Sequence, residues 1–394
     1  MLTLSIKLVY LYFKTLELIQ KMDINKIQAP TIILNKKVVI ENIRAMVEKA
    51  KKHNLIFRPH FKTHQSAEIG NWIKNTGANK ITVSSVGMAN YFAENGWDDI
   101  TIAFPLNIRE LKKIEKLAKQ VHLNILIGSL ETIRYLHKKV NQKIGFFIKI
   151  DTGYHRSGIP ASDIESIQQI LNQAKPNKNL QFKGFLSHFG HSYYADNKRD
   201  VLIIFEDGKK QLVILKNHFI KEYPDLIISV GDTPSCTLAD NFSGIDEIRP
   251  GNFVFFDLMQ YNIGVCKASE IAMVVACPVV DKSPKRGELL IYGGAVHFSK
   301  EYIFDKHGNK VFGKAVRLTE NGWSETENNI YVSGLSQEHG IIKATGSFIE
   351  SLKIGDLLGV LPVHSCLTAN LLKEYYEIGG GCIKMWGGKL KPFS

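Results

Sequence analysis

Short apolar runs alternate with stretches of helical spacing from residue 29 onward. Eight runs rich in Ile, Val and Phe have the character of buried strands: APTIIL, LIFRPHFK, KITVSSV, DITIAFP, VHLNILIG, IGFFIKID, FKGFLSHF and LIISVGD. The helical stretches between them cover residues 36–53, 65–76, 87–95, 109–121, 129–140, 161–174 and 199–222. This alternation indicates βαβ units and a parallel sheet of the α/β class. The number and even spacing of the strands favour a closed (β/α)8 barrel of the TIM type. An open doubly wound sheet is the alternative, although no Gly-x-Gly-x-x-Gly turn follows the first strand.

The pattern changes after RPGNFVFFD, residues 249–257. The later segments, such as EIAMVVACPVVD and GELLIYGGAVHF, are short, β-rich and separated by Gly, Pro and Asn turns. This texture is typical of an antiparallel β domain. We therefore predict a lead-in over residues 1–27, a (β/α)8 barrel over 28–262 and a β domain over 263–394.

Composition excludes several classes of protein. With 394 residues and 44% hydrophobic content, the chain is long enough for a large domain and a smaller one. The net charge is +12, but the lysines are spread along the chain and no basic run is interleaved with aromatic residues, which disfavours a nucleic-acid partner. The five cysteines are scattered, without a Cys-x-x-Cys pair, which favours a reducing compartment and a cytoplasmic location.

The first 22 residues are apolar, but Lys7, Lys14 and Glu17 interrupt them. The uninterrupted stretches are too short to span a membrane, and no small-residue cleavage site follows. We expect either an amphipathic extension or a start of translation at Met22, and no membrane partner.

Polar residues follow several of the predicted barrel strands. Lys62 ends the second strand, and DTGYHRSG, SHFGHSYY and SVGDTPS follow the sixth, seventh and eighth. Active sites of such barrels lie at this end of the strands. Lys62 could extend its ammonium into solvent, as most lysines at strand ends do. It could also form a Schiff base with a carbonyl group.

Two turns are candidates for binding a phosphate group. The GDTPS stretch offers backbone amides near Gly231 and the hydroxyls of Thr233 and Ser235, although the same letters also form ordinary turns. Arg249, just before a Pro-Gly turn, is either a surface charge or a residue that faces a pyridine nitrogen.

His364 and Cys366 are the candidate metal ligands. They are two residues apart, so both side chains leave an extended backbone on the same side. Imidazole and thiolate together suit zinc. A buried cysteine beside a hydrogen-bonded histidine is the more common arrangement.

Five motifs taken together resemble the family of D-serine dehydratases and D-threonine aldolases. RPHFKTH, KIDTGYHRSGI, SHFGHSYYA, SVGDTPS and IRPGNFVFFD occur in the order and spacing of that family, and the likeness runs from about residue 28 to about 386. The resemblance implies an alanine-racemase-type barrel, a C-terminal β domain, pyridoxal 5'-phosphate as cofactor and a homodimer.

Roles for individual residues come from the same resemblance. Lys62 matches the lysine that holds the cofactor covalently, and Arg156 and His188 match residues close to the cofactor and substrate. Arg249 matches an arginine that faces the pyridine nitrogen. The remaining cofactor-binding positions that the motifs imply are Tyr193, Gly231, Thr233, Gly251 and Asn252.

The resemblance also assigns a divalent metal, Zn²⁺ or another such as Mn²⁺ or Mg²⁺, to His364 and Cys366 in the β domain. Its members carry His-x-Cys or His-x-Asp at this place, and the cysteine form is more similar to the dehydratases. We therefore expect a lyase that removes water from D-serine or D-threo-3-hydroxyaspartate. The alternatives are a D-threonine aldolase, an amino-acid racemase, which would leave the metal pair unexplained, and a non-catalytic cofactor carrier.

Overall fold

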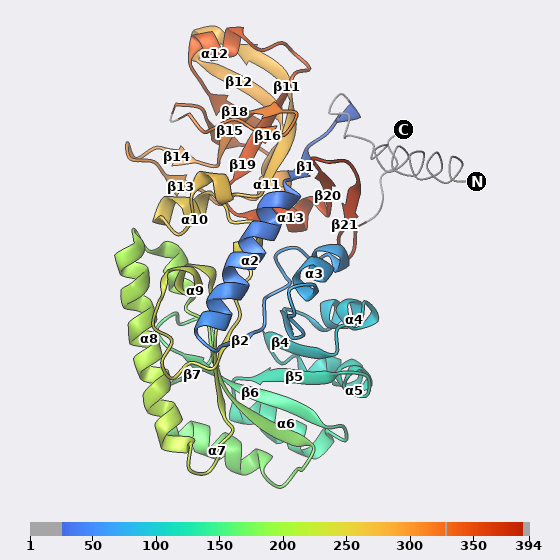
Figure 1. Ribbon diagram of the computed structural model, residues 1–394, viewed down its shortest axis with the longest axis vertical. Helices are drawn as coiled ribbons and strands as arrows, with labels where there is room; N and C mark the ends of the chain where they lie inside the picture. The colour runs from blue at the N-terminus through green and yellow to red at the C-terminus, as the bar shows by residue number, and fades with distance from the viewer. Residues whose placement is uncertain (1–25, 328, 389–394) are drawn as a thin grey trace, which may run out of the picture. The chain divides into compact units, whose positions relative to one another are not determined.

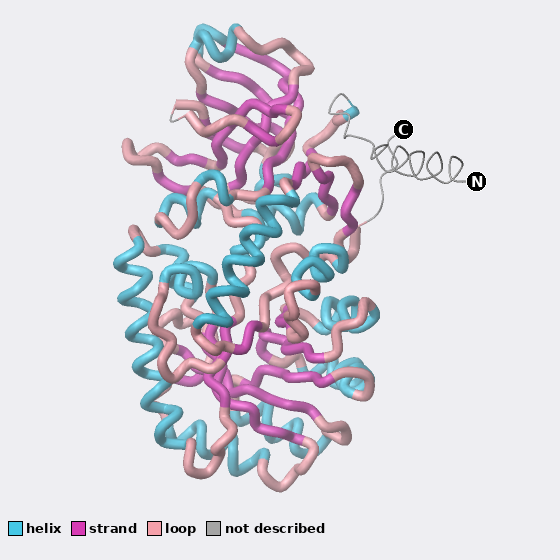
Figure 2. Tube along the Cα trace, in the orientation of Figure 1, coloured by secondary structure: helices cyan, strands magenta, loops and turns pink. Residues whose placement is uncertain are grey.

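The computed structural model describes residues 26–388 except residue 328, and the chain forms two compact units. We call Ile40–Lys267 the barrel unit, and the described residues up to Val39 together with those from Ala268 the β unit. Figure 1 shows the elements of each unit, and Figure 2 shows their helices and strands. The expectations for the first 22 residues lie outside the described part of the chain.

Eight parallel strands form the core of the barrel unit. Their order is β2, β10, β9, β8, β6, β5, β4 and β3, so that β2 and β3 are the two edges. The ring is closed beyond β2, where the Thr82 N–H donates to Pro59 O at 2.9 Å and the Phe61 N–H donates to Thr82 O at 2.8 Å. The strands are β2 (Ile56–Phe57), β3 (Ile81–Val83), β4 (Asp99–Pro105), β5 (His122–Ile127), β6 (Ile144–Asp151), β8 (Leu180–Ser187), β9 (Ile227–Val230) and β10 (Glu247–Ile248). Leu126, Phe147 and Leu186 form a buried cluster in this unit.

Helices between the strands cover the barrel (Figure 1). They match the seven stretches of helical spacing, although α4 and α8 each begin one residue earlier than predicted: α2 (Lys36–Lys52), α3 (Ala67–Lys74), α4 (Val86–Glu94), α5 (Leu111–Ala118), α6 (Leu130–Lys139), α7 (Ile164–Ala174) and α8 (Lys198–Phe219). The buried residues of α5, Leu111, Ile114 and Leu117, recur every three residues and face the sheet side of an otherwise Lys-rich helix. The long helix α8 begins after Asn197, whose side chain accepts hydrogen bonds from the backbone N–H groups of Arg199 and Asp200. The predicted (β/α)8 barrel with a C-terminal antiparallel β domain is confirmed.

One predicted barrel strand belongs to the β unit instead. The run APTIIL contains β1 (Thr31–Leu34), which pairs antiparallel with β11 (Met273–Ser283) and parallel with β20 (Glu374–Glu377). The eighth barrel strand is β10, a two-residue strand. The turn of Lys62 therefore follows the first barrel strand, and the three later motifs follow the fifth, sixth and seventh.

The β unit contains a closed antiparallel barrel. The order β12, β18, β17, β15, β19, β11 returns to β12 through a second pairing of the long strand β11, and β1, β20 and β21 extend the sheet from β11. The further strands are β12 (Glu288–Tyr292), β15 (Gly313–Thr319), β17 (Tyr331–Leu335), β18 (His339–Lys343), β19 (Leu357–Pro362) and β21 (Cys382–Lys384). Helix α13 (Ser365–Leu372) connects β19 to β20.

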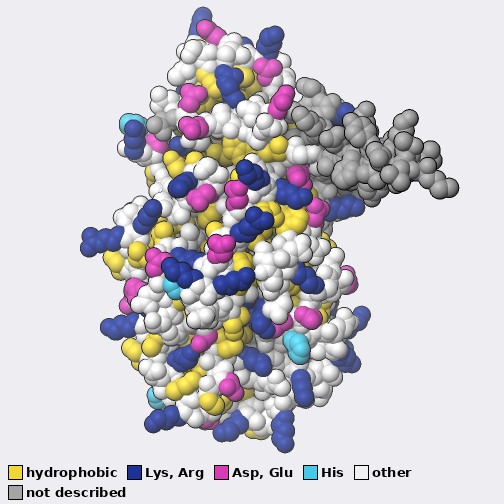
Figure 3. Space-filling view, viewed as in Figure 1, with side chains coloured by type: hydrophobic (Ala, Val, Ile, Leu, Met, Phe, Trp, Pro, Cys, Tyr) yellow, Lys and Arg dark blue, Asp and Glu magenta, His cyan; other side chains and the backbone are white. Residues whose placement is uncertain are grey.

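The surface has charges of both signs. On the face shown in Figure 3, Lys and Arg side chains are dispersed and lie among Asp and Glu side chains. Within the described residues, none of the helices has the length and apolar character needed to cross a membrane.

Candidate active site

Lys62 lies in a tight turn that directly follows the first barrel strand. Its neighbour Phe61 is completely buried and packs edge-on against Phe92 and Trp97, at ring-centroid distances of 4.8 and 5.0 Å. The Lys62 N–H donates to Nδ1 of His60 at 3.3 Å. Phe61 thus anchors the turn while the Lys62 side chain stays exposed.

The turn of Lys62 is bonded to the turn that follows β10. The His60 N–H donates to Pro250 O at 2.8 Å. A Cβ atom at Gly251 would lie 2.8 Å from His60 O and 3.0 Å from Thr63 Oγ1, so the close approach of the two turns requires glycine there. The side chain of Asn252 donates to Asp257 Oδ2 at 2.6 Å.

Two further strand ends join this pair of turns. The Phe253 N–H donates to Thr233 Oγ1 at 3.2 Å, which connects the turn after β10 to the GDTPS stretch after β9. The Thr233 N–H in turn donates to the Tyr193 hydroxyl at 3.2 Å, which connects GDTPS to the loop after β8. Four loops from four strands are therefore held together by specific hydrogen bonds.

His188, directly after β8, is a neutral histidine that is hydrogen-bonded to Gly231, the first residue of the GDTPS stretch. Its Nδ1 lies within hydrogen-bond distance of Gly231 O, which can only accept, so Nδ1 carries the proton. Burial, and then the positive charge of Lys62, hold the pKa of His188 well below 6.5. The pKa of His60 is lowered in the same way by burial and then by Lys62. Both rings are thus uncharged at neutral pH and close enough to the Lys62 ammonium to sense it.

Arg156 lies in the loop after β6, whose shape is set by a single carboxylate. Asp151 Oδ1 accepts hydrogen bonds from the backbone N–H groups of Gly153 and His155, both at 3.0 Å. Burial raises the pKa of Asp151, but these bonds outweigh it and lower the pKa overall. The Arg156 guanidinium lies over the ring of Tyr154 at 4.9 Å, and that ring stacks on His191 at 6.1 Å.

Two buried cations lie beneath these loops. Arg249 is 4% exposed; its Nε donates to Ser229 Oγ at 2.7 Å and its Nη2 to Ser187 O at 2.6 Å. Lys149 on β6 is 6% exposed and donates to Ile150 O at 2.7 Å. Burial, followed by the charge of Arg249, lowers the pKa of Lys149 to about 7.

The structure thus brings the predicted barrel residues into one region. Contacts or neighbouring turns link Lys62, His188, Tyr193, Gly231, Thr233, Arg249, Gly251 and Asn252, and the charge of Arg156 acts on His188. The sequence did not identify His60 or Tyr154 as participants. His60 lies two residues before Lys62 in the same motif, and Tyr154 lies in the motif of Arg156.

The predicted metal pair lies in the β unit, at the start of a helix rather than in an extended segment. His364 is the N-cap of α13 and has an extended backbone, but Cys366 is the second residue of that helix, so the expected extended backbone is wrong from Ser365 onward. Nδ1 of His364 lies 2.5 Å from Glu301 Oε2, a contact that the sequence did not predict. Among the residues that the structure describes, no group of three or more His, Cys, Asp or Glu side chains is placed to hold a metal.

Comparisons with known proteins agree with this fold. The family model for the N-terminal domain of alanine racemase matches residues 34–258, and that for a putative serine dehydratase domain matches residues 272–378. The D-serine dehydratase of Dictyostelium discoideum is 30% identical over 380 residues, covering 90% of this chain and 94% of the relative. The D-threo-3-hydroxyaspartate dehydratase of Delftia sp. HT23 is 25% identical over 378 residues, covering 91% and 97%.

Solved structures show the same fold. The Delftia dehydratase superposes with a TM-score of 0.84 at 24% identity, covering 92% of this chain and 98% of that one. The D-threonine aldolase of Filomicrobium marinum superposes with a TM-score of 0.74 at 20% identity, covering 91% and 94%.

The chain therefore belongs to the family of enzymes that join an alanine-racemase N-terminal domain to a serine dehydratase domain. Its curated relatives are dehydratases and aldolases, and the chain is an enzyme of the lyase class.

Proposed function

We propose that the protein is a lyase dependent on pyridoxal phosphate and a divalent metal, which dehydrates a D-β-hydroxy amino acid to a keto acid and ammonia. D-Serine and D-threo-3-hydroxyaspartate are the proposed substrates, as in the two relatives described above. The observation that carries the proposal is the exposed Lys62, held on a turn that is hydrogen-bonded to the glycine turn after β10.

The residues present fit pyridoxal phosphate. Lys62 supplies an accessible amine for the aldehyde of the cofactor. Thr233 Oγ1 already accepts a hydrogen bond from Phe253, so its own proton is directed elsewhere and suits an anionic phosphate oxygen. Gly231 and Gly251 keep the adjoining backbone without side chains, and Asn252 would contribute through its backbone because its amide is bonded to Asp257. Tyr193 and Arg249 complete the proposed binding set.

The cofactor, when bound, supplies an electron sink for the α-carbon of the substrate. The residues of this chain would then manage protons and orientation. Lys62 Nζ would take the α-proton, and the exposed guanidinium of Arg156 would attract the substrate carboxylate. His188, fixed by Gly231 O in one tautomer, would present uncharged Nε2 and add no positive charge beside Lys62.

The donor set at residues 364–366 fits a divalent metal of the zinc type. Imidazole and thiolate are preferred zinc ligands. Water and substrate oxygen would complete the coordination. Since Nδ1 of His364 contacts the Glu301 carboxylate, Nε2 is the nitrogen that would hold the metal. Two solved relatives are a histidine-to-alanine mutant and a cysteine-to-alanine mutant in the metal-free form, and the two mutated positions are two apart, as here. The metal would supply a Lewis acid for departure of the β-hydroxyl group.

Product identification tests the proposed reaction. The purified protein, loaded with pyridoxal phosphate and Zn²⁺, is incubated with D-serine, D-threonine and their L-forms. Pyruvate or 2-oxobutyrate with ammonia, from the D-forms alone, is the expected result. Turnover restricted to L-forms would disprove the stereochemistry, and undiminished turnover after chelation would disprove the metal. Lys62→Ala should remove the visible absorption band that the bound cofactor gives the wild-type protein.

Aldol cleavage is the second candidate, because the matching relatives also include aldolases. The D-threonine aldolase of Arthrobacter sp. is 24% identical and covers 94% of both chains. In the assay above, glycine with acetaldehyde from D-threonine would identify this reaction.

We also propose a cytoplasmic homodimer. The five cysteines are all free, which suits a reducing compartment. Light scattering on the purified protein measures its mass, and a value equal to one chain of 44.4 kDa would disprove the dimer.

A further inference from the structure

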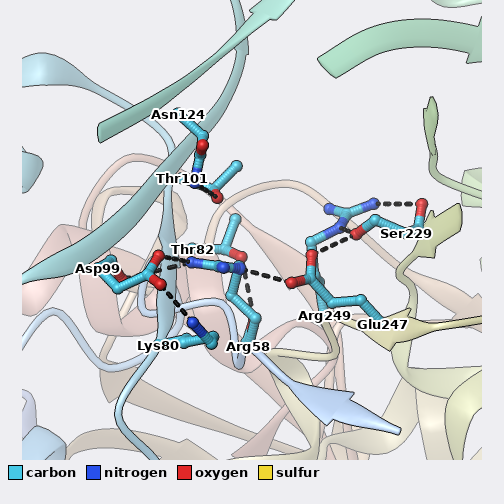
Figure 4. A network of polar contacts seen from close by, with 9 residues as sticks. All are labelled: Arg58, Lys80, Thr82, Asp99, Thr101, Asn124, Ser229, Glu247 and Arg249. Atoms are coloured by element: carbon cyan, nitrogen blue, oxygen red, sulfur yellow. Dashed lines mark hydrogen bonds and ion pairs between the residues drawn. The ribbon is translucent and has the colours of Figure 1, made fainter. Parts of the chain in front are cut away.

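A chain of buried polar side chains connects Arg249 to Arg58 within the barrel unit, as Figure 4 shows. Nε of Arg249 donates to Ser229 Oγ at 2.7 Å, and Ser229 Oγ donates to Glu247 Oε1 at 2.6 Å. The second oxygen of Glu247 accepts from Nε of Arg58 at 2.7 Å. All four residues are 4% exposed or less, so the chain is shielded from water along its length. The function proposed above uses only Arg249.

Glu247 supplies the negative charge in this row of hydrogen-bonded side chains. It is completely buried and lies between two arginines that would otherwise repel each other. Burial lowers the pKa of Arg249 to about 10, and among the charges that counteract burial, Glu247 is the strongest. Arg249 therefore remains cationic at neutral pH, and Glu247 contributes most to keeping it so.

The same contacts also fix the orientation of Arg249. Its Nε is held by Ser229 Oγ and its Nη2 by Ser187 O, at 2.7 and 2.6 Å. Its Nη1 makes no hydrogen bond to any residue of the described chain. Because a guanidinium is planar, two fixed nitrogens determine its plane and leave the third available to a ligand.

The Arg58 end of this row of hydrogen-bonded side chains is in contact with water. Nη1 of Arg58 donates to Asp99 Oδ1 at 2.5 Å, and the Asp99 side chain is 17% exposed. Asp99 and Arg58 line a cavity of about 850 Å³, together with the first residue of β5, His122. Asp99 is thus partly exposed to solvent, whereas Glu247 is completely buried.

We propose that Glu247, acting through the Ser229 hydroxyl, is a positioning residue that fixes the plane and the charge of Arg249 against the ring of the bound cofactor. This inference rests on the proposed function, with Arg249 facing the ring nitrogen as the family resemblance implies. It assigns Ser229 and Glu247, acting through Arg249, a part in setting the electronic state of that ring.

The test compares two variants that interrupt the contacts between Arg249 and Glu247 with two that leave these contacts in place. Ser229→Ala removes only the hydroxyl that joins Glu247 to Arg249, and Glu247→Gln removes the charge. Asp99→Asn breaks the ion pair at the far end of the chain. Thr101→Val removes another fully buried barrel hydroxyl, whose contact is the Asn124 amide at 3.3 Å rather than Arg249.

Each protein is loaded with pyridoxal phosphate, and its absorption band, the pH titration of that band and the cofactor affinity are measured. For Ser229→Ala and Glu247→Gln we expect a shifted titration, a cofactor Kd raised about tenfold, and a lowered kcat with KM nearly unchanged. Asp99→Asn and Thr101→Val should keep the wild-type band and titration, even where they lower the melting temperature. Ser229→Ala carries the test if Glu247→Gln does not fold.

The outcomes separate the two proposals. If the wild type forms a band and Ser229→Ala leaves its wavelength, titration and affinity unchanged, the positioning role is disproved while the proposed function stands. An equal spectral change in Asp99→Asn also disproves it, since any loss of barrel stability would then suffice. A wild type that forms no band with pyridoxal phosphate overturns both.

Discussion

At the scale of single residues, Lys149 shows how burial determines protonation in this barrel. The amine is nearly inaccessible and its pKa is lowered to about 7, mainly by burial and then by Arg249. An unfolded lysine titrates near 10.5. Between these values the unfolded chain binds the proton more strongly, so this residue makes folding less favourable as pH falls from 10.5 toward 7.

We therefore expect Lys149→Met to increase the free energy of unfolding most at pH 7 and below. The gain should shrink by about 1.4 kcal/mol for each pH unit as the pH rises from 7 toward 10.5. Urea unfolding of both proteins at pH 6.5 and 9 measures this difference. The exposed Lys138 of α6 provides the control, because Lys138→Met should show no such trend. A gain independent of pH would contradict the assignment.

Glu301 provides a second prediction for a single residue. A carboxylate bonded to the second nitrogen of a metal-binding histidine orients the ring and increases its basicity. Glu301→Gln should therefore weaken Zn²⁺ binding by about 10–100-fold, measured by competition with a chromogenic chelator. Glu338→Gln is the matched control, because Glu338 lies 3.8 Å from the ring of another histidine, His297. Equal effects of both variants would argue against a specific role for Glu301.

At the scale of elements, the loop after β8 supports the loop after β6 through a single glycine. A Cβ at Gly190 would lie 2.3 Å from the ring of Tyr154, the ring that carries Arg156. Gly190→Ala should displace Tyr154 and lower kcat/KM by about 10–100-fold without unfolding the barrel. Steady-state kinetics with circular dichroism measures both effects. At Gly346 a Cβ meets no atom within 4 Å, so Gly346→Ala should retain full activity.

The sequence predicted most elements because local patterns determine them. The seven helices and most barrel strands follow from apolar periodicity, which needs no knowledge of the partner. The assignment of β1 to the barrel was wrong because an apolar run does not reveal which sheet it joins. Strand β10 was missed because it has two residues, one of them the charged Glu247. The loops were placed correctly at strand ends, but their mutual hydrogen bonds, such as Thr233 to Tyr193, depend on closure of the ring.

At the scale of the whole molecule, β1 makes the β unit depend on residues from the opposite end of the chain. Ile32 is completely buried and lies opposite Val275 of β11. Ile32→Ala should cost about 2–4 kcal/mol through the cavity it leaves. Hydrogen exchange followed by mass spectrometry should show faster exchange in β11 and β20, with β5 and β6 unchanged. Faster exchange in the barrel strands alone would contradict the pairing.

The pairing of β1 also has a consequence for synthesis on the ribosome. Chains grow at about 5–20 residues per second, so roughly tens of seconds separate the emergence of β1 from that of β11, its first pairing partner. During this interval all eight strands of the barrel unit emerge, while β1 waits with its apolar residues and backbone groups unpaired. A nascent chain of this protein therefore carries an unpaired apolar segment until β11 has emerged, and a chaperone that shields this segment in the interval would raise the yield of folded enzyme.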